Sequence, residues 1–167
     1  MKKKSAMSTI FKITALLTFI IFLVGCKKDA IPPGDAQYDL NVLLDGQGKF
    51  QFSGSGFIEF RQNPDTDRIV DLNTSVRNLE PNHAYLLQRA VNPITDATCS
   101  STAWLTLGLG LTPQSIHTDG WGNGHADLWR NVSSVARGTQ FHIHFQVIDS
   151  TTTETVLSSG CYQYTVR

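Results

Sequence analysis

Apolar and polar residues alternate along several segments of the chain, which is the pattern of half-buried β-strands. The clearest alternation runs over residues 141–148, and a similar one runs over residues 162–166. The intervening turn, at residues 149–153, is placed to join these two segments as a terminal hairpin. Six earlier segments also predict strands: 38–44, 49–61, 68–76, 84–91, 103–109 and 124–132.

These segments predict an all-β fold with about eight strands. Outside the amino-terminal apolar run, no segment shows a helical apolar stripe of more than a turn or two. The roughly 140 residues from position 26 onward are enough for one domain with a core, and too few for two. We therefore expect a single antiparallel Greek-key β-sandwich over residues 37–167, whose two sheets bury alternate residues against each other.

A short motif favours such a sandwich. Leu79, Pro81 and Tyr85 have the spacing of the Leu-x-Pro-x-x-x-Tyr pattern, and the segment resembles the tyrosine corner of fibronectin type III and related domains. The resemblance implies that the Tyr85 hydroxyl bonds back to the main chain and fixes a crossing between two sheets. The alternative is an ordinary proline-containing turn before a strand.

The longest apolar run lies near the amino end, at residues 13–24, after a lysine-rich start. It is shorter than the roughly 20 residues of a membrane-spanning helix, so it predicts a signal peptide. Its end, Leu23-Val24-Gly25-Cys26, resembles the lipobox of bacterial lipoproteins. The resemblance implies that residues 1–25 are a cleaved signal peptide, that Cys26 receives the lipid, and that residues 26–36 form a tether.

Lipidation of Cys26 predicts a protein anchored in the bacterial cell envelope, with the membrane as its first partner. Two or three acyl chains, including the usual palmitate on the new amino terminus, would make the anchor effectively permanent. Lys27 follows the cysteine instead of the Asp that retains some lipoproteins at the inner membrane, so we expect the outer membrane. The surface and periplasmic orientations both stay open, and an ordinary secretory signal or an uncleaved anchor is the alternative.

Loss of the leader changes both the charge and the cysteine count. The full chain has 14 basic and 14 acidic residues, but from Cys26 onward 10 Lys and Arg face 14 Asp and Glu. No basic patch remains, so nucleic acid is not an expected partner. If Cys26 is lipidated, Cys99 and Cys161 are left as a pair in an oxidising compartment and predict a disulfide. Two buried free thiols are the alternative.

Two histidines are the main candidates for metal binding. His142 and His144 lie on one face of a predicted strand, about 7 Å apart at the backbone, which is close enough to share a metal. The pair resembles the His-x-His copper-binding strand of copper/zinc superoxide dismutases, and His117 and His125 could complete such a site, although no sequence spacing requires it. The simpler interpretation is two polar residues on the outer face of a half-buried strand, in which case no metal and no cofactor is expected.

Two loops carry oxygen atoms of the kind that bind calcium. Asp119 and Asn123 lie in a glycine-rich loop, but that loop lacks the bidentate Glu of an EF-hand, so a tight turn is the simpler interpretation. Asn63, Asp65 and Asp67 form a second candidate, for which a solvated turn is again the simpler interpretation.

Motifs for catalysis are missing from the sequence. It contains no nucleophile elbow, no HExxH and no glycine-rich phosphate loop. Asp127 and Glu59 would act as paired carboxylates only if the fold brought them together. A non-catalytic role is therefore favoured.

Trp121 is the candidate ligand-binding residue. It lies in the glycine-rich loop, where a place in the core is unexpected, whereas Trp104 and Trp129 lie in strand-like segments and are expected in the core. Exposed aromatic rings on β-sandwiches suit stacking against sugars. We expect a non-catalytic envelope lipoprotein that serves as a binding or structural module for a glycan, a peptide or another envelope protein. The alternative is a metal-binding or dismutase-like protein that uses His142 and His144.

Overall fold

The computed structural model describes residues 37–47, 54–64 and 67–167, which lie in one compact unit, Ala36–Arg167. The predicted signal peptide, Cys26 and the tether lie outside the described residues, as does Asp65 of the second calcium candidate. Within the described ranges the secondary structure is all β, and no helix there is long and apolar enough to cross a membrane.

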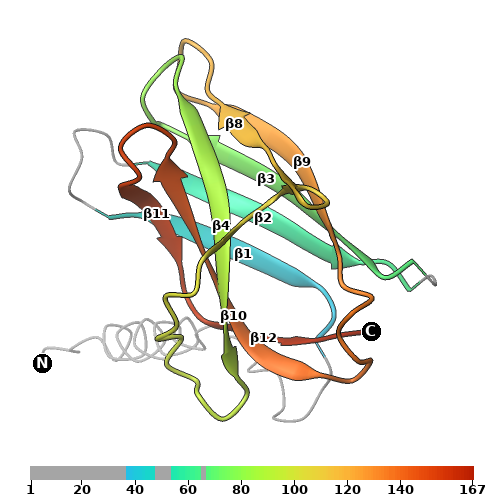
Figure 1. Ribbon diagram of the computed structural model, residues 1–167. Coiled ribbons are helices and arrows are strands. Elements are labelled where there is room, and N and C mark those ends of the chain that lie inside the picture. Colours follow the sequence, from blue (N-terminus) through green and yellow to red (C-terminus); the bar gives the residue numbers. More distant parts are fainter. Residues whose placement is uncertain (1–36, 48–53, 65–66) are drawn as a thin grey trace, which may run out of the picture. The chain divides into compact units, whose positions relative to one another are not determined.

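Strands account for most of the described chain (Figure 1). Eight of them have four residues or more: β1 (Leu40–Gly46), β2 (Ser55–Gln62), β3 (Ile69–Arg77), β4 (Ala84–Pro93), β9 (Gly124–Asn131), β10 (Gln140–Asp149), β11 (Thr155–Ser159) and β12 (Tyr162–Thr165). Four are shorter: β5 (Leu105–Thr106), β6 (Gly108–Leu109), β7 (Thr112–Pro113) and β8 (Ser115–His117).

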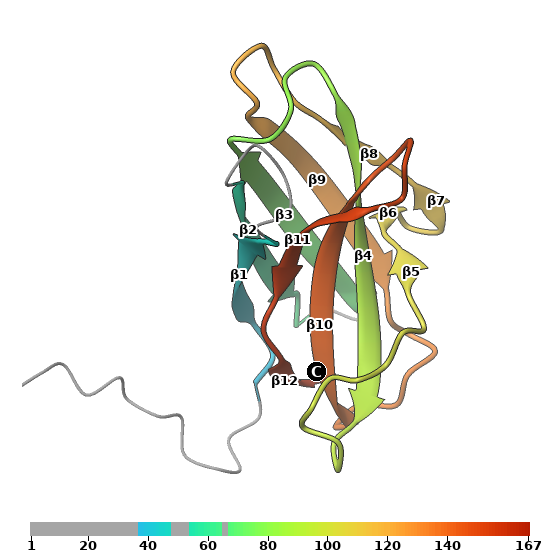
Figure 2. The same ribbon diagram turned by 90° about the vertical axis from the view of Figure 1, so that its left-hand side faces the viewer.

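All of these strands are hydrogen-bonded into one mixed sheet. Its order is β5-β4-β10-β11-β1-β2-β3-β9-β6-β7, with β12 on β10 and β8 on β4. The pairs are antiparallel except for β6 with β9, which is parallel. In Figure 2, β1, β2, β3 and β9 lie in one layer, and β4, β10 and β11 lie opposite them.

The two ends of this sheet are joined by the segment from β5 to β8. β5 and β8 pair with β4, whereas β6 pairs with β9. The Leu107 amide donates to the Leu87 carbonyl, and an isolated bridge links Thr118 to Gly124. The sheet therefore curls into a nearly closed barrel, because a single segment bonds to both of its edges.

The all-β prediction is confirmed, but the predicted set of about eight strands in an antiparallel sandwich differs from the observed sheet. The extra strands, β5 to β8, have only two or three residues, too few for a period of two to be visible. The predicted terminal hairpin also changes, because β11 forms the hairpin with β10. β12 pairs instead with the first half of β10, over residues 140–143.

The core fills the space between the two layers. It is made of aliphatic side chains from β1, β2, β3, β4, β9, β10 and β11, with an aromatic group in which Phe60 lies edge-on to both Phe145 and Tyr164. The Tyr164 hydroxyl donates to the Oε1 atom of buried Gln62, at 2.6 Å. Burial raises the pKa of Tyr164, so this hydroxyl keeps its proton and remains a donor.

The predicted disulfide is present. Cys99 and Cys161 are bonded, with their Cα atoms 5.7 Å apart and 62 positions apart in sequence. The bond connects the loop after β4 to the turn between β11 and β12. On the chain-entropy model, closing a loop of this length stabilises the fold by about 4 kcal/mol.

Candidate functional site

Three loops meet at one end of the described unit, shown at the top of Figure 1. They are residues 78–83 between β3 and β4, residues 118–123 between β8 and β9, and residues 150–154 between β10 and β11, together with the adjoining strand ends Ala84 and Asp149. We call this group the loop end. Backbone hydrogen bonds join the loops: the Leu79 amide donates to the Gly122 carbonyl at 3.1 Å, and the Ser150 amide donates to the Ala84 carbonyl at 3.1 Å.

Tyr85 has the hydrogen bond expected of a tyrosine corner. Its hydroxyl accepts from the backbone amide of Glu80 at 3.0 Å, and its side chain is buried. Burial raises the pKa of Tyr85, so the phenol stays neutral. Thr118, in the loop between β8 and β9, also stabilises the turn that precedes Tyr85. Its hydroxyl donates to the Glu80 carbonyl and accepts from the His83 amide.

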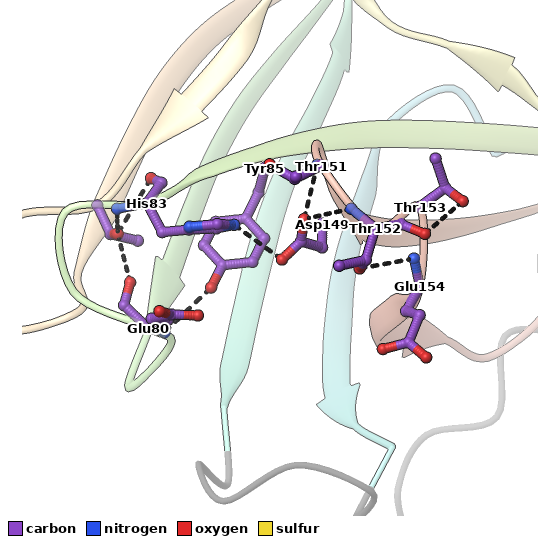
Figure 3. Close-up of polar contacts among 9 residues, drawn as sticks. Glu80, His83, Tyr85, Asp149, Thr151, Thr152, Thr153 and Glu154 are labelled. Carbon is purple, nitrogen blue, oxygen red and sulfur yellow. Dashed lines mark hydrogen bonds and ion pairs between the residues drawn. The ribbon is translucent and has the colours of Figure 1, made fainter.

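Asp149 is the polar centre of the loop end (Figure 3). Its Oδ2 atom lies 2.7 Å from the Nε2 atom of His83, and its Oδ1 atom accepts from the amides of Thr151 and Thr152 at 2.6 and 2.9 Å. Burial acts to raise the pKa of Asp149, but the two amides and the neighbouring His83 outweigh it and lower the pKa. The carboxylate is therefore charged at neutral pH and holds the β10–β11 turn against β4.

A cleft of about 200 Å³ opens beside this carboxylate. Glu80, Asp149 and Glu154 line it, and no described lining residue is a lysine or an arginine. One ligand atom each from Glu80, His83 and Asp149 lie within 4.8 Å of one another. One imidazole nitrogen and two carboxylates form a donor set that suits a divalent transition metal such as zinc. The sequence did not predict this group, because Asp149 is far from His83 in the chain and meets it only through strand pairing.

Trp121 projects from the middle loop of the loop end, and its side chain is 84% exposed. The loop itself is held in place. The Oδ1 atom of Asp119 accepts from the amides of Trp121 and Asn123 at 2.8 and 2.9 Å, and these bonds lower the pKa of Asp119. Gly122 has a φ of +77° and lies against Leu79, where a Cβ atom would overlap the Leu79 carbonyl oxygen. The tight turn that the sequence predicts is present, and this Asp119 oxygen caps it.

His142 and His144 meet no third metal ligand among the described residues. The only gathered group of three or more His, Cys, Asp or Glu side chains in that part of the chain is the one at the loop end. His144 instead packs on Trp104, with ring centroids 4.7 Å apart, and its Nε2 atom lies 3.1 Å from the Ser101 carbonyl oxygen. Burial lowers the pKa of His144. These contacts give His144 a packing role against the loop that follows β4.

Ser75, His125 and Asp127 form a second polar group, on the outer face of β3 and β9. The Nδ1 atom of His125 lies 3.4 Å from the Ser75 hydroxyl, and its Nε2 atom lies 3.1 Å from an Asp127 oxygen. The order resembles a catalytic triad, but the His125 and Asp127 side chains are 52% and 78% exposed. Charge stabilisation in catalysis depends on a site that excludes water, and this open face does not provide one. The contacts follow from register, since Ser75 pairs directly with His125.

The remaining candidates from the sequence are the carboxylate pair and the two other tryptophans. Glu59 and Asp127 lie on the same outer face, but Asn73 pairs with both and separates them by two strand spacings, roughly 10 Å. Trp104 and Trp129 were expected in the core, which is wrong for both: Trp104 is half-buried, and Trp129 is 38% exposed over Gly110.

Comparisons of the chain with protein-family models, with curated proteins and with solved structures gave no match. The class of protein is therefore defined by its own geometry: a single all-β domain with a rigid loop end that carries an exposed indole and an acidic cleft.

Proposed function

We propose that the protein is a non-catalytic binding module of the bacterial cell envelope, anchored through a lipid on Cys26, and that it binds a glycan at the loop end. The observation that carries this proposal is Trp121. A large apolar ring that is 84% exposed on a loop with a fixed backbone has no structural task in the described unit.

The chemistry of the loop end suits a sugar. The face of an indole ring stacks on the C–H face of a pyranose, which buries apolar area on both partners. Because the loop backbone is already ordered, binding does not have to order it again. The carboxylates of Glu80 and Glu154, at the neighbouring cleft, are acceptors for sugar hydroxyl groups.

Binding to peptidoglycan and to its soluble saccharide fragments tests this proposal. We expect wild-type protein to sediment with insoluble peptidoglycan, and Trp121→Ala to bind the fragments at least about tenfold more weakly by calorimetry. Trp129→Ala is the matched control, because Trp129 lies at the far end of β9, and it should bind as wild type does. Equal binding by Trp121→Ala and wild type would overturn the proposal, as would no binding by wild type.

Lipidation is tested separately in a bacterial host fed labelled palmitate. The lipobox requires that wild-type protein takes up label and fractionates with membranes, and that Cys26→Ala does neither. Incorporation into Cys26→Ala would refute the assignment. The outer-membrane location and its orientation follow from density separation of the membranes and from protease access in whole cells.

A second candidate function is binding of a divalent metal, favoured by the close approach of Glu80, His83 and Asp149. This moves the metal-binding alternative from His142 and His144 to the loop end. Zinc should then raise the melting temperature of wild-type protein and leave that of His83→Gln unchanged. If zinc stabilises neither protein or both equally, this candidate fails.

We also make a proposal about the topology of the domain. We infer that the domain is a variant of a Greek-key sandwich whose two layers have joined at their edges. The tyrosine corner at Tyr85, where the chain passes from β3 in one layer to β4 in the other, supports this inference.

A further inference from the structure

A small cavity lies inside the curled sheet, between its two layers. Its volume is about 60 Å³, and aromatic and aliphatic side chains form most of its wall. Phe60, Phe141 and Phe145 contribute three rings. Two arginines, Arg89 and Arg130, are the only charged residues among the described side chains that line it.

Both arginines come from inward-facing strand positions. Along β4, Arg89 shares the inner face with buried Leu87. Along β9, Arg130 shares the inner face with buried Leu128. The segment from β5 to β8 pairs with both of these strands where the sheet nearly closes, and both arginines line the cavity there.

Neither arginine has a carboxylate partner within the described chain. The ion pairs found there involve Arg61, Arg167, His83 and His125 as the cationic partners. Arg130 donates to the Gly110 carbonyl oxygen at 2.9 Å, which leaves its charge uncompensated.

Such an arrangement is unfavourable in the free protein. Both side chains are half-buried, and two like charges without a carboxylate partner beside one apolar cavity are unfavourable. Burial and the nearby charge of Arg130 both lower the pKa of Arg89. Guanidinium groups nevertheless stay protonated in proteins, so the cavity carries positive charge beside apolar walls. An anion with an apolar body would satisfy both features.

We propose that this cavity binds a small organic carboxylate of the size of acetate, with the carboxylate group at Arg89 and Arg130 and the methyl group toward the wall that Phe60, Phe141 and Phe145 form. Arginine recognises carboxylates through paired N–H donors, which suits this head group. The ligand is small because a cavity of about 150 Å³ holds a benzene ring, and this one has less than half that volume. The site is separate from the loop end and does not depend on the glycan proposal.

Titration of the full chain with sodium acetate, followed by calorimetry and by NMR of the aromatic rings, tests the proposal. Acetate should bind saturably, whereas the isosteric neutral acetamide and inorganic phosphate should each bind at least about tenfold more weakly. Arg89→Gln should lose at least about tenfold in acetate affinity, and Arg137→Gln, an exposed arginine outside the cavity, should lose none.

Each control has an outcome that overturns the proposal. Equal binding of acetamide would show that the arginines do not recognise the ligand, and tighter binding of phosphate would show that the apolar wall does not contribute. Unchanged affinity in Arg89→Gln, or no binding of acetate to wild type, would contradict the site directly. Thermal unfolding shows whether Arg89→Gln is folded, and we expect it to melt no lower than wild type without ligand because an unpaired charge is removed. If it does not fold, Arg130→Gln is measured instead under the same criteria.

Discussion

At the scale of single residues, Asp149 shows how one side chain organises the loop end. Its carboxylate pairs with His83 and caps the turn through the amides of Thr151 and Thr152. These partners lower its pKa despite burial. A carboxyl whose pKa is lower in the folded protein than in the unfolded chain stabilises the fold when ionised. That contribution is complete above the ordinary carboxyl pKa and is lost as the pH falls through the lower folded value.

Replacement of Asp149 by asparagine removes this contribution. We expect Asp149→Asn to be less stable than wild type by about 1 to 3 kcal/mol at neutral pH, because a charged acceptor of two amides is lost. Its free energy of unfolding should also fall less steeply than that of wild type below about pH 4. Urea unfolding from pH 7 down to pH 3 measures both effects, with exposed Asp127→Asn as the control. If the free energy of unfolding of Asp149→Asn fell with pH as steeply as that of wild type, the Asp149 carboxylate would not be the group responsible for the pH dependence.

The sequence predicted some of these residues and missed others for identifiable reasons. Tyr85 was predicted because its motif is local, and the exposure of Trp121 was predicted because its loop is rich in glycine. Arg89 was missed, since two apolar residues at 86–87 are followed by two polar ones at 88–89. An alternation of period two does not show which of these four residues face inward. Only the structure of the sheet shows that Arg89 does so and lines the cavity.

At the scale of elements, the loop between β8 and β9 carries Trp121 and determines its position. Its shape depends on Gly122, whose positive φ and contact with Leu79 leave no room for a side chain. The loop is thus fixed by a second loop rather than by a strand. A sequence pattern predicts a turn here, but it does not predict which other loop the turn packs against.

Gly122→Ala tests the fixed conformation of this loop. We expect a loss of about 1 to 3 kcal/mol in unfolding free energy, because the new Cβ atom overlaps the Leu79 carbonyl and the backbone is strained. Binding at Trp121 should weaken as well, since the loop must move. Gly120→Ala is the matched control, because a Cβ atom there meets nothing within 4 Å. Equal stability of the two variants, by urea unfolding, would contradict the packing described.

At the scale of the whole described unit, one sheet curls until its edges are joined by the segment from β5 to β8. The alternation of apolar and polar residues predicted the long strands. Closure of the sheet depends on strands of two or three residues, which are too short to show such an alternation. The disulfide reinforces the opposite end from the loop end, since β4 spans roughly 30 Å between its first and last residues.

Removal of the disulfide should therefore affect stability more than function. We expect the double variant Cys99→Ser, Cys161→Ser to lose about 4 kcal/mol of unfolding free energy on the chain-entropy model. Binding at the loop end should be unchanged at temperatures where the variant stays folded. Denaturant unfolding of the oxidised protein and the double variant measures the loss, and a difference near zero would contradict this role.

The central claim is that Trp121 contacts a glycan. The most direct test is an NMR titration that follows the indole N–H signals of the three tryptophans while soluble peptidoglycan saccharides are added. We predict that the Trp121 signal shifts progressively and saturates, whereas the signals of Trp104 and Trp129 stay in place as internal controls. Three unmoved signals, or shifts confined to Trp104 and Trp129, would contradict the claim.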